Sequence, residues 1–95
     1  MNMITPRNVT RHELVGLRCR VVGSEDESLV GIEGRVVDET THTLVVETDD
    51  SEKTVPKPYT TFEFEIPGDT DDETTVVRVE GEAIDARPAE RARGV

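Results

Sequence analysis

The sequence predicts a single, mainly β domain: a small six-stranded antiparallel barrel with short N- and C-terminal helical segments. Short segments of alternating or β-branched residues are separated by turn signals along most of the chain, which is typical of a small closed barrel. Only 3% of the residues are aromatic, so the core must consist mostly of Val, Ile and Leu, which favour strands. A chain of 95 residues is long enough for one modest core. We therefore expect one domain over residues 1–95, with the barrel at about 17–84.

Helix signals lie near the two ends of the chain. Thr5 is a good N-cap and Pro6 suits the first helical position, which together predict a short helix to about His12. Residues 88–93 are consistent with a C-terminal helical turn. The N-terminal segment has too little apolar surface to stabilise so short a helix alone, so we expect it to need a docking surface.

Six segments between these ends have strand patterns. In the first, Leu17, Cys19 and Val21 alternate with more polar residues, which predicts a half-buried strand and makes Cys19 a core thiol. In the second, Gly31 and Gly34 mark positions where a strand bends sharply or admits another backbone closely. The predicted strands are residues 17–22, 30–38, 43–48, 53–56, 61–66 and 74–80, the fourth being an edge strand or strand end because it contains a proline.

The net charge of −10 comes from 21 acidic residues against 11 cations, whereas a domain that binds nucleic acid is expected to be basic. The acids cluster in predicted turns at 25–27, 49–50 and 69–73, and nine of the 11 cations are arginines. An acidic surface is a known adaptation to molar salt, so we expect a halophilic source. At molar ionic strength the Debye length is about 3 Å, so acidic loops do not repel nucleic acid from a distance and binding must rely on close arginine contacts.

No residue set in the sequence supports catalysis, and no metal site is expected. The single cysteine excludes an intramolecular disulfide and a cysteine-based zinc site. His12 and His42 are candidates for an acid–base pair, although a turn residue and a helix-end residue are the simpler interpretation. The acidic run at 69–73 lacks the spacing of a calcium loop, and the glycines at 31 and 34 lack the Lys-Ser/Thr of a phosphate-binding loop.

No apolar stretch approaches the roughly 20 residues needed to cross a bilayer, and the N-terminus has no signal-peptide core. We therefore expect a cytoplasmic protein without membrane contact.

The arginines and lysines are the candidate binding residues, because guanidinium and ammonium groups recognise phosphate. Arg18 and Arg20 are predicted on the outer face of the first strand, Arg35 interrupts the apolar second strand, and Arg78 faces outward from the sixth. Arg7 shares a helix face with Arg11, and Lys53 and Lys57 flank the fourth strand. Taken together, the set favours recognition of the backbone and shape of a structured RNA over scattered solubilising charge.

Several separated motifs also resemble a known family. These are residues 11–17, 28–40, 43–47, 54–57 and 62–64, and in this order they resemble archaeal ribonuclease P protein component 1. The resemblance extends from about Ile4 to Arg91. It implies an Sm-like barrel, and its basic positions map onto Arg11, His12, Arg35, Lys53, Lys57 and Arg78. With Arg18 and Arg20 from the strand pattern, these are the predicted RNA-binding residues.

The resemblance implies a noncatalytic subunit that supports RNA-catalysed 5′ maturation of precursor tRNA. It implies three partners: ribonuclease P RNA, a zinc-ribbon protein subunit that forms a heterodimer with this chain, and precursor tRNA as the substrate of the holoenzyme. No cofactor is expected on the protein itself, and Mg²⁺ is expected for the RNA-catalysed reaction. The alternative is another SH3-like RNA-binding barrel of the translation machinery, because residues 31–37 also resemble the glycine-centred strand of such proteins.

Overall fold

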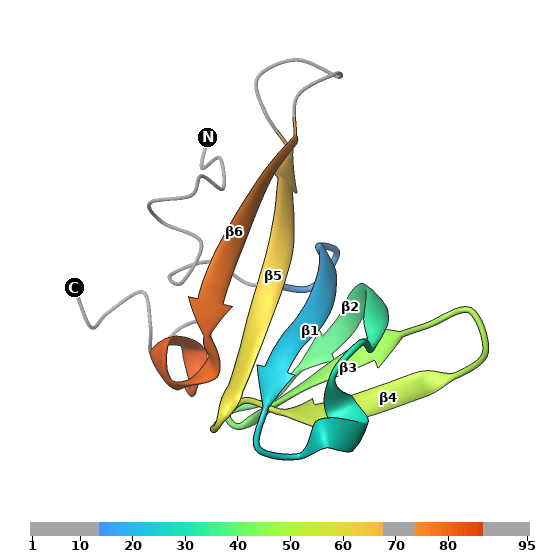
Figure 1. Cartoon of the computed structure of the whole chain (residues 1–95). Coiled ribbons are helices and arrows are strands. Elements are labelled where there is room, and N and C mark those ends of the chain that lie inside the picture. Colours follow the sequence, from blue (N-terminus) through green and yellow to red (C-terminus); the bar gives the residue numbers. More distant parts are fainter. Residues whose placement is uncertain (1–13, 68–73, 87–95) are drawn as a thin grey trace.

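The computed structural model describes residues 14–67 and 74–86, which form one six-stranded antiparallel sheet in the order β4-β3-β2-β1-β5-β6 (Figure 1). The strands are β1 (Arg18–Ser24), β2 (Glu33–Glu39), β3 (Thr43–Glu47), β4 (Glu52–Pro56), β5 (Thr60–Pro67) and β6 (Thr74–Glu80). Two short 3₁₀ helices, η2 (Glu27–Leu29) and η3 (Gly81–Ile84), follow β1 and β6. All six predicted strands are present, although the second begins at Glu33 and not at Val30, because residues 30–31 form a turn. The predicted helices at 5–12 and 88–93 and the acidic run at 69–73 lie outside the described residues.

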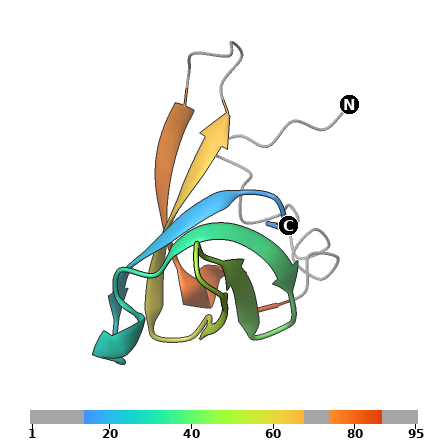
Figure 2. The ribbon, with the colours of Figure 1, turned by 90° about the vertical axis from the view of Figure 1, so that its right-hand side faces the viewer.

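The sheet curves around an aliphatic core with two aromatic rings, and Figure 2 shows this curvature in β1 and β2. Phe62 and Phe64 are fully buried, with ring centroids 5.8 Å apart. Cys19 is 3% exposed, which confirms it as a core residue. The remaining core residues are Leu14, Leu17, Val21, Val36, Leu44, Val46, Val55, Ile66, Val79 and Ile84. None of the helices within residues 14–67 and 74–86 is long and apolar enough to cross a membrane.

Of the two glycines of the second predicted strand, Gly34 lies within a strand as expected, whereas Gly31 lies in the turn before β2. Gly31 has a φ of +97°, a conformation that side chains disfavour, and it ends the turn that precedes β2. Gly34 lies in β2, where a Cβ atom would overlap the carbonyl oxygen of Glu47 on β3. One glycine therefore permits the turn and the other permits the close approach of two strands.

The prediction of a closed barrel is wrong for the part of the chain that the structure describes. The edge strand β4 pairs only with β3, and the other edge strand β6 pairs only with β5. A barrel closes only when its two edges share hydrogen bonds. Here the chain leaves the sheet at Gly81, where β6 passes directly into η3. The gap between the edges is crossed by polar side chains instead.

Lys57, just after β4, makes the central contact across this gap. Its side chain is 0% exposed, and its Nζ donates to Glu39 Oε2 at 2.8 Å and to the carbonyl oxygens of Thr40 at 2.8 Å, Thr41 at 3.1 Å and Ala86 at 2.9 Å. The predicted contact of Lys57 with RNA is therefore corrected: the amine is enclosed by protein acceptors and cannot reach a phosphate. Its role is to join the β2–β3 turn to the segment after η3.

The same ion pair also contacts the first described residue of the chain. The backbone N–H of Leu14 donates to Glu39 Oε1 at 3.3 Å. Beside it, His42 Nδ1 lies 2.6 Å from Asp85 Oδ1, and the N–H of Lys57 donates to the carbonyl oxygen of His42 at 2.7 Å. Both ends of the described chain are thus attached at one buried ion pair.

Acidic side chains of the described loops are exposed, including Asp49 and Asp50 between β3 and β4. Because screening weakens repulsion among these charges in the compact state, we expect the melting temperature to rise by about 5 °C or more between ~0.1 M and ~3 M KCl. The double variant Asp49→Asn, Asp50→Asn should show a smaller rise with the same fold. Thermal melts followed by circular dichroism across the salt series provide the measurement, and a melting temperature that falls with salt would contradict the electrostatic argument.

Candidate nucleic-acid interface

The four arginines within the described residues lie on one outer face of the sheet. Arg18 and Arg20 alternate on β1 with buried Cys19 and Val21, so both project away from the core. The strand register extends this face across β2, β5 and β6. One row runs Glu33, Arg20, Glu63, Arg78, and the next runs Arg35, Arg18, Glu65, Val76. We call these eight residues the arginine face.

Glutamates of β5 bind three of the four arginines. Glu63 accepts from Arg20 Nη2 through Oε1 and from Arg78 Nη2 through Oε2, both at 3.1 Å. The hydrogen bond from Arg78, followed by that from Arg20, holds the pKa of Glu63 below its usual value. Arg18 Nε lies 3.5 Å from Glu65 Oε2. Exposed pairs of this kind contribute only about 0–1 kcal/mol each, so a guanidinium can exchange its carboxylate for a phosphate at little cost.

Arg35 is placed differently from the other three arginines. It lies directly opposite Arg18 in the β1–β2 register, and like charges in such positions repel each other. Its Nη1 donates to the carbonyl oxygen of Gly16 at 2.6 Å. No carboxylate of the described residues lies within ion-pair distance of Arg35. An anion bound between Arg18 and Arg35 would relieve their repulsion, so this pair is a candidate phosphate position.

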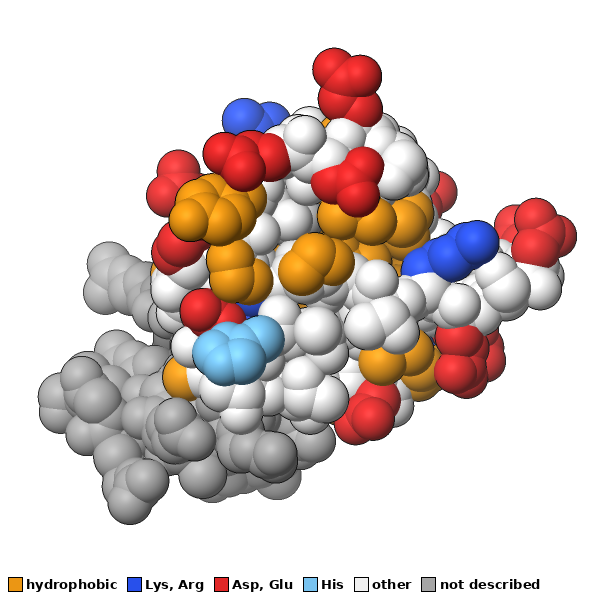
Figure 3. Space-filling model, turned by 90° about the horizontal axis from the view of Figure 1, so that it is seen from below, with side chains coloured by type: hydrophobic (Ala, Val, Ile, Leu, Met, Phe, Trp, Pro, Cys, Tyr) orange, Lys and Arg blue, Asp and Glu red, His pale blue; other side chains and the backbone are white. Residues whose placement is uncertain are grey.

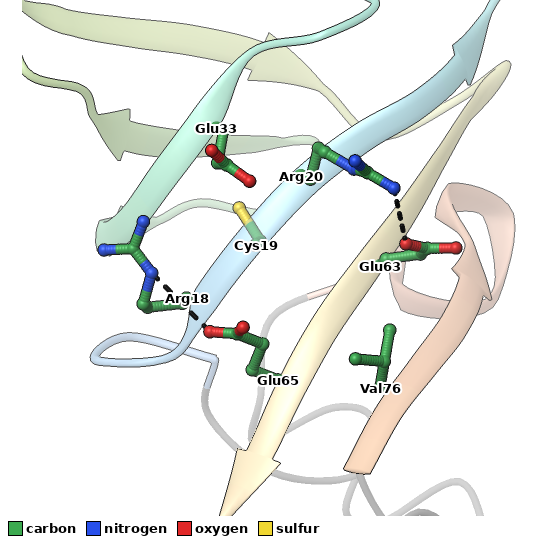
Figure 4. A pocket seen from close by; sticks show the side chains of 7 residues that line it. All are labelled: Arg18, Cys19, Arg20, Glu33, Glu63, Glu65 and Val76. Carbon is green, nitrogen blue, oxygen red and sulfur yellow. Dashed lines mark hydrogen bonds and ion pairs between the residues drawn. The ribbon is translucent and has the colours of Figure 1, made fainter. Parts of the chain in front are cut away.

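A shallow pocket of about 180 Å³ lies in the middle of the arginine face, and Figure 4 shows the side chains that line it. Cys19 lies between Arg18 and Arg20, and burial raises the pKa of its thiol to about 12, so the thiol stays protonated and is a poor nucleophile. Val76 adds an apolar rim and is 56% exposed. Guanidinium groups beside an apolar rim suit a sugar-phosphate backbone better than a reacting substrate.

The structure brings together four of the eight predicted RNA-binding residues, namely Arg18, Arg20, Arg35 and Arg78. Lys53 is exposed on β4, which two strands separate from β1. Lys57 is buried, as described above, and Arg11 and His12 lie outside the described residues.

Sequence reasoning missed the glutamates that bind the arginines. The alternation of Glu63 and Glu65 with Phe62 and Phe64 does show that both acids face outward. Which arginine each of them meets depends on the strand register, which the alternation does not give. Among the described residues, no group of three or more His, Cys, Asp or Glu side chains is arranged to hold a metal ion.

Comparison with known proteins decides the family. The family model for "Ribonuclease P/MRP, subunit p29" matches residues 7–94. This chain belongs to the ribonuclease P/MRP subunit p29 family. The match favours a ribonuclease P subunit over the alternative, an SH3-like RNA-binding barrel of the translation machinery.

Curated relatives agree with the p29 assignment. The chain is 48% identical over 92 residues to ribonuclease P protein component 1 of Methanothermobacter thermautotrophicus, covering 96% of this chain and 94% of the relative. It is 52% identical over 66 residues to ribonuclease P protein component 1 of Halobacterium salinarum, covering 70% of this chain and 54% of the relative. The chain is thus similar to subunits of archaeal ribonuclease P.

A solved structure shows the same fold. Mth11, described as a homologue of the human RNase P protein Rpp29, superposes with a TM-score of 0.58 and 46% sequence identity, covering 84% of this chain and 97% of that chain. The p29 assignment therefore rests on both sequence and fold.

Proposed function

We propose that this p29 family member is a noncatalytic, RNA-binding subunit of ribonuclease P. In this proposal it binds the ribonuclease P RNA through the arginine face and thereby supports RNA-catalysed 5′ maturation of precursor tRNA. The observation that carries the proposal is the gathering of Arg18, Arg20, Arg35 and Arg78 on one outer face of a strongly acidic protein. Family membership supports the identity of the RNA.

The arginine face would act by holding phosphates that approach each other in the folded RNA. Structured RNA is recognised mainly by its shape and through phosphate and 2′-hydroxyl contacts, and a guanidinium can donate two parallel hydrogen bonds to one phosphate. The spacing of the strands sets the arginines in fixed rows, so the face would favour one local backbone geometry. Any Mg²⁺ used in cleavage would belong to the RNA in this proposal, and the protein's part is to position RNA.

The proposed assembly also includes other proteins. We propose that the chain forms a heterodimer with a zinc-ribbon subunit and that precursor tRNA is the substrate of the complete holoenzyme. Family membership supports an assembly of this kind.

Arginine variants test the RNA contact. We expect Arg18→Ala and Arg35→Ala each to weaken binding of ribonuclease P RNA by at least about tenfold, because a hydrogen-bonded ion contact is worth about 1.5–3 kcal/mol. Lys53→Ala is the matched control: it removes one exposed positive charge away from the face, so the effect should be much smaller. Fluorescence titration of labelled RNA measures affinity, and cleavage of precursor tRNA by the reconstituted holoenzyme reports function.

The same titration includes a variant that is expected to raise the affinity for RNA. Glu63→Gln removes the carboxylate that binds Arg20 and Arg78, so RNA binding should become a few-fold tighter. Asp50→Asn makes the same change in net charge on a distant loop and should have little effect. If Lys53→Ala weakens RNA binding as much as Arg35→Ala, and Asp50→Asn strengthens it as much as Glu63→Gln, only overall charge matters and the arginine face is not the RNA site.

A further inference from the structure

An apolar groove lies on a different part of the surface from the arginine face, between the β1–η2 loop and the β4–β5 turn. It has a volume of about 250 Å³ and is lined by Ser24, Glu25, Asp26, Leu29, Pro56, Pro58, Tyr59 and Thr60. We call it the Tyr59 groove. Figure 3, which views the molecule from below, shows apolar side chains gathered on this side with acidic groups around them. The groove shares no lining residue with the pocket of the arginine face.

Tyr59 is held in an unusual conformation that presents its ring to solvent. Its φ of 61° makes it the one non-glycine residue with positive φ among those described, and the residue is 65% exposed. Its N–H donates to Glu82 Oε2 at 2.9 Å, and its carbonyl oxygen accepts from the N–H of Glu25 at 3.1 Å. A bulky residue in the left-handed region is strained, and such strain concentrates at functional sites. Because the ring is mostly exposed, its burial contributes little free energy to offset this strain.

Two prolines and a side-chain hydrogen bond restrain the backbone around Tyr59. Pro56 and Pro58 restrict the backbone on either side of Lys57, and Thr60 Oγ1 lies 3.3 Å from Ser24 Oγ, which joins the turn to the end of β1. A preformed groove loses little conformational entropy on binding. An exposed tyrosine on such a support is typical of an interface anchor.

The charge around the groove indicates its occupant. Glu25 and Asp26 line it, and Glu82 lies beside the Tyr59 backbone. Hydrogen bonds from the Ser28 hydroxyl and N–H hold the pKa of Asp26 below its usual value, so this carboxylate is charged. These acids repel phosphate and attract Lys and Arg.

From this geometry we infer that the Tyr59 groove binds a protein partner through a segment with an apolar side chain flanked by Lys or Arg. The apolar side chain packs on Tyr59, Leu29 and the prolines, and the flanking cation faces Glu25 and Asp26. In ribonuclease P the partner is another protein subunit, a choice that rests on the proposed function.

The test uses each of the other ribonuclease P protein subunits from the same organism, purified singly and titrated calorimetrically. Tyr59→Gly and Tyr59→Asn remove the ring while accepting a positive φ, so both variants should stay folded. We expect both to weaken the binding of one subunit at least about tenfold. Glu25→Lys should weaken the same complex, whereas Asp50→Lys, with the same change in net charge on the β3–β4 loop, should not.

The outcomes separate this inference from the proposed function. Unchanged binding of every subunit by the folded Tyr59 variants would overturn the inference. Loss of affinity for protein-free ribonuclease P RNA in those variants would also overturn it, since the ring would then stack on a base. The arginine variants test RNA binding independently, so failure of one proposal leaves the other standing.

Discussion

Replacing Lys57 with methionine is expected to lower the free energy of unfolding by about 3–5 kcal/mol, because the buried carboxylate of Glu39 would lose its ion pair with the Lys57 amine. The carbonyl oxygens of Thr40, Thr41 and Ala86 would also lose the hydrogen bonds that the Lys57 amine donates to them. A domain of this size is stable by only about 5–15 kcal/mol, so much of its stability is at stake. The melting temperature should fall by roughly 12 °C or more. Urea unfolding followed by circular dichroism provides the free energies.

The control for this experiment is Lys53→Met, which removes an exposed lysine of β4 and should change stability by no more than about 0.5 kcal/mol. The double variant Glu39→Met, Lys57→Met should recover part of the loss, since it removes both members of the buried ion pair. It should not recover all of it, because the Leu14 N–H also loses its acceptor. If Lys57→Met costs no more than Lys53→Met, the buried ion pair does not hold the edges of the sheet together.

Gly34→Ala should be comparably destabilising, although it adds only one carbon atom. The new Cβ would overlap the carbonyl oxygen of Glu47, lie 2.8 Å from the carbonyl carbon of Glu47 and lie 3.1 Å from Val46 Cγ1. Backbone atoms of a paired strand cannot move aside as a flexible side chain can, so β2 and β3 would have to separate locally. We expect a loss of at least about 3 kcal/mol, at the upper end of the effects of overpacking.

Gly23→Ala is the matched control, because its Cβ would meet only Thr61 Cβ at 3.7 Å and Thr61 Oγ1 at 3.8 Å, which are ordinary contacts. We expect it to change the free energy of unfolding by less than about 1 kcal/mol. Hydrogen exchange at the β2–β3 amides would show whether the damage in Gly34→Ala is local to that pair. Equal melting temperatures for the two variants would contradict the close-approach argument.

The sequence by itself determined the strands and the direction of most side chains, because strand alternation is a property of the local backbone. The pattern around Cys19 placed Arg18 and Arg20 on the outer face, and the alternation of Phe62, Glu63 and Phe64 separated core from surface on β5. Family membership was also readable in the order of the motifs. These features need no knowledge of how the strands pair.

The tertiary structure alone decided how distant segments meet. It set Glu63 between Arg20 and Arg78, because that contact depends on the register of three strands. It left the two edges of the sheet unpaired, and it buried Lys57, which as a lysine in a turn was expected at the surface. The acceptors at Glu39, Thr40, Thr41 and Ala86 lie 16 to 29 residues away from Lys57 in the sequence. The free-energy cost of burying a charge is offset only when such partners meet in space. The local sequence does not show which distant residues will meet.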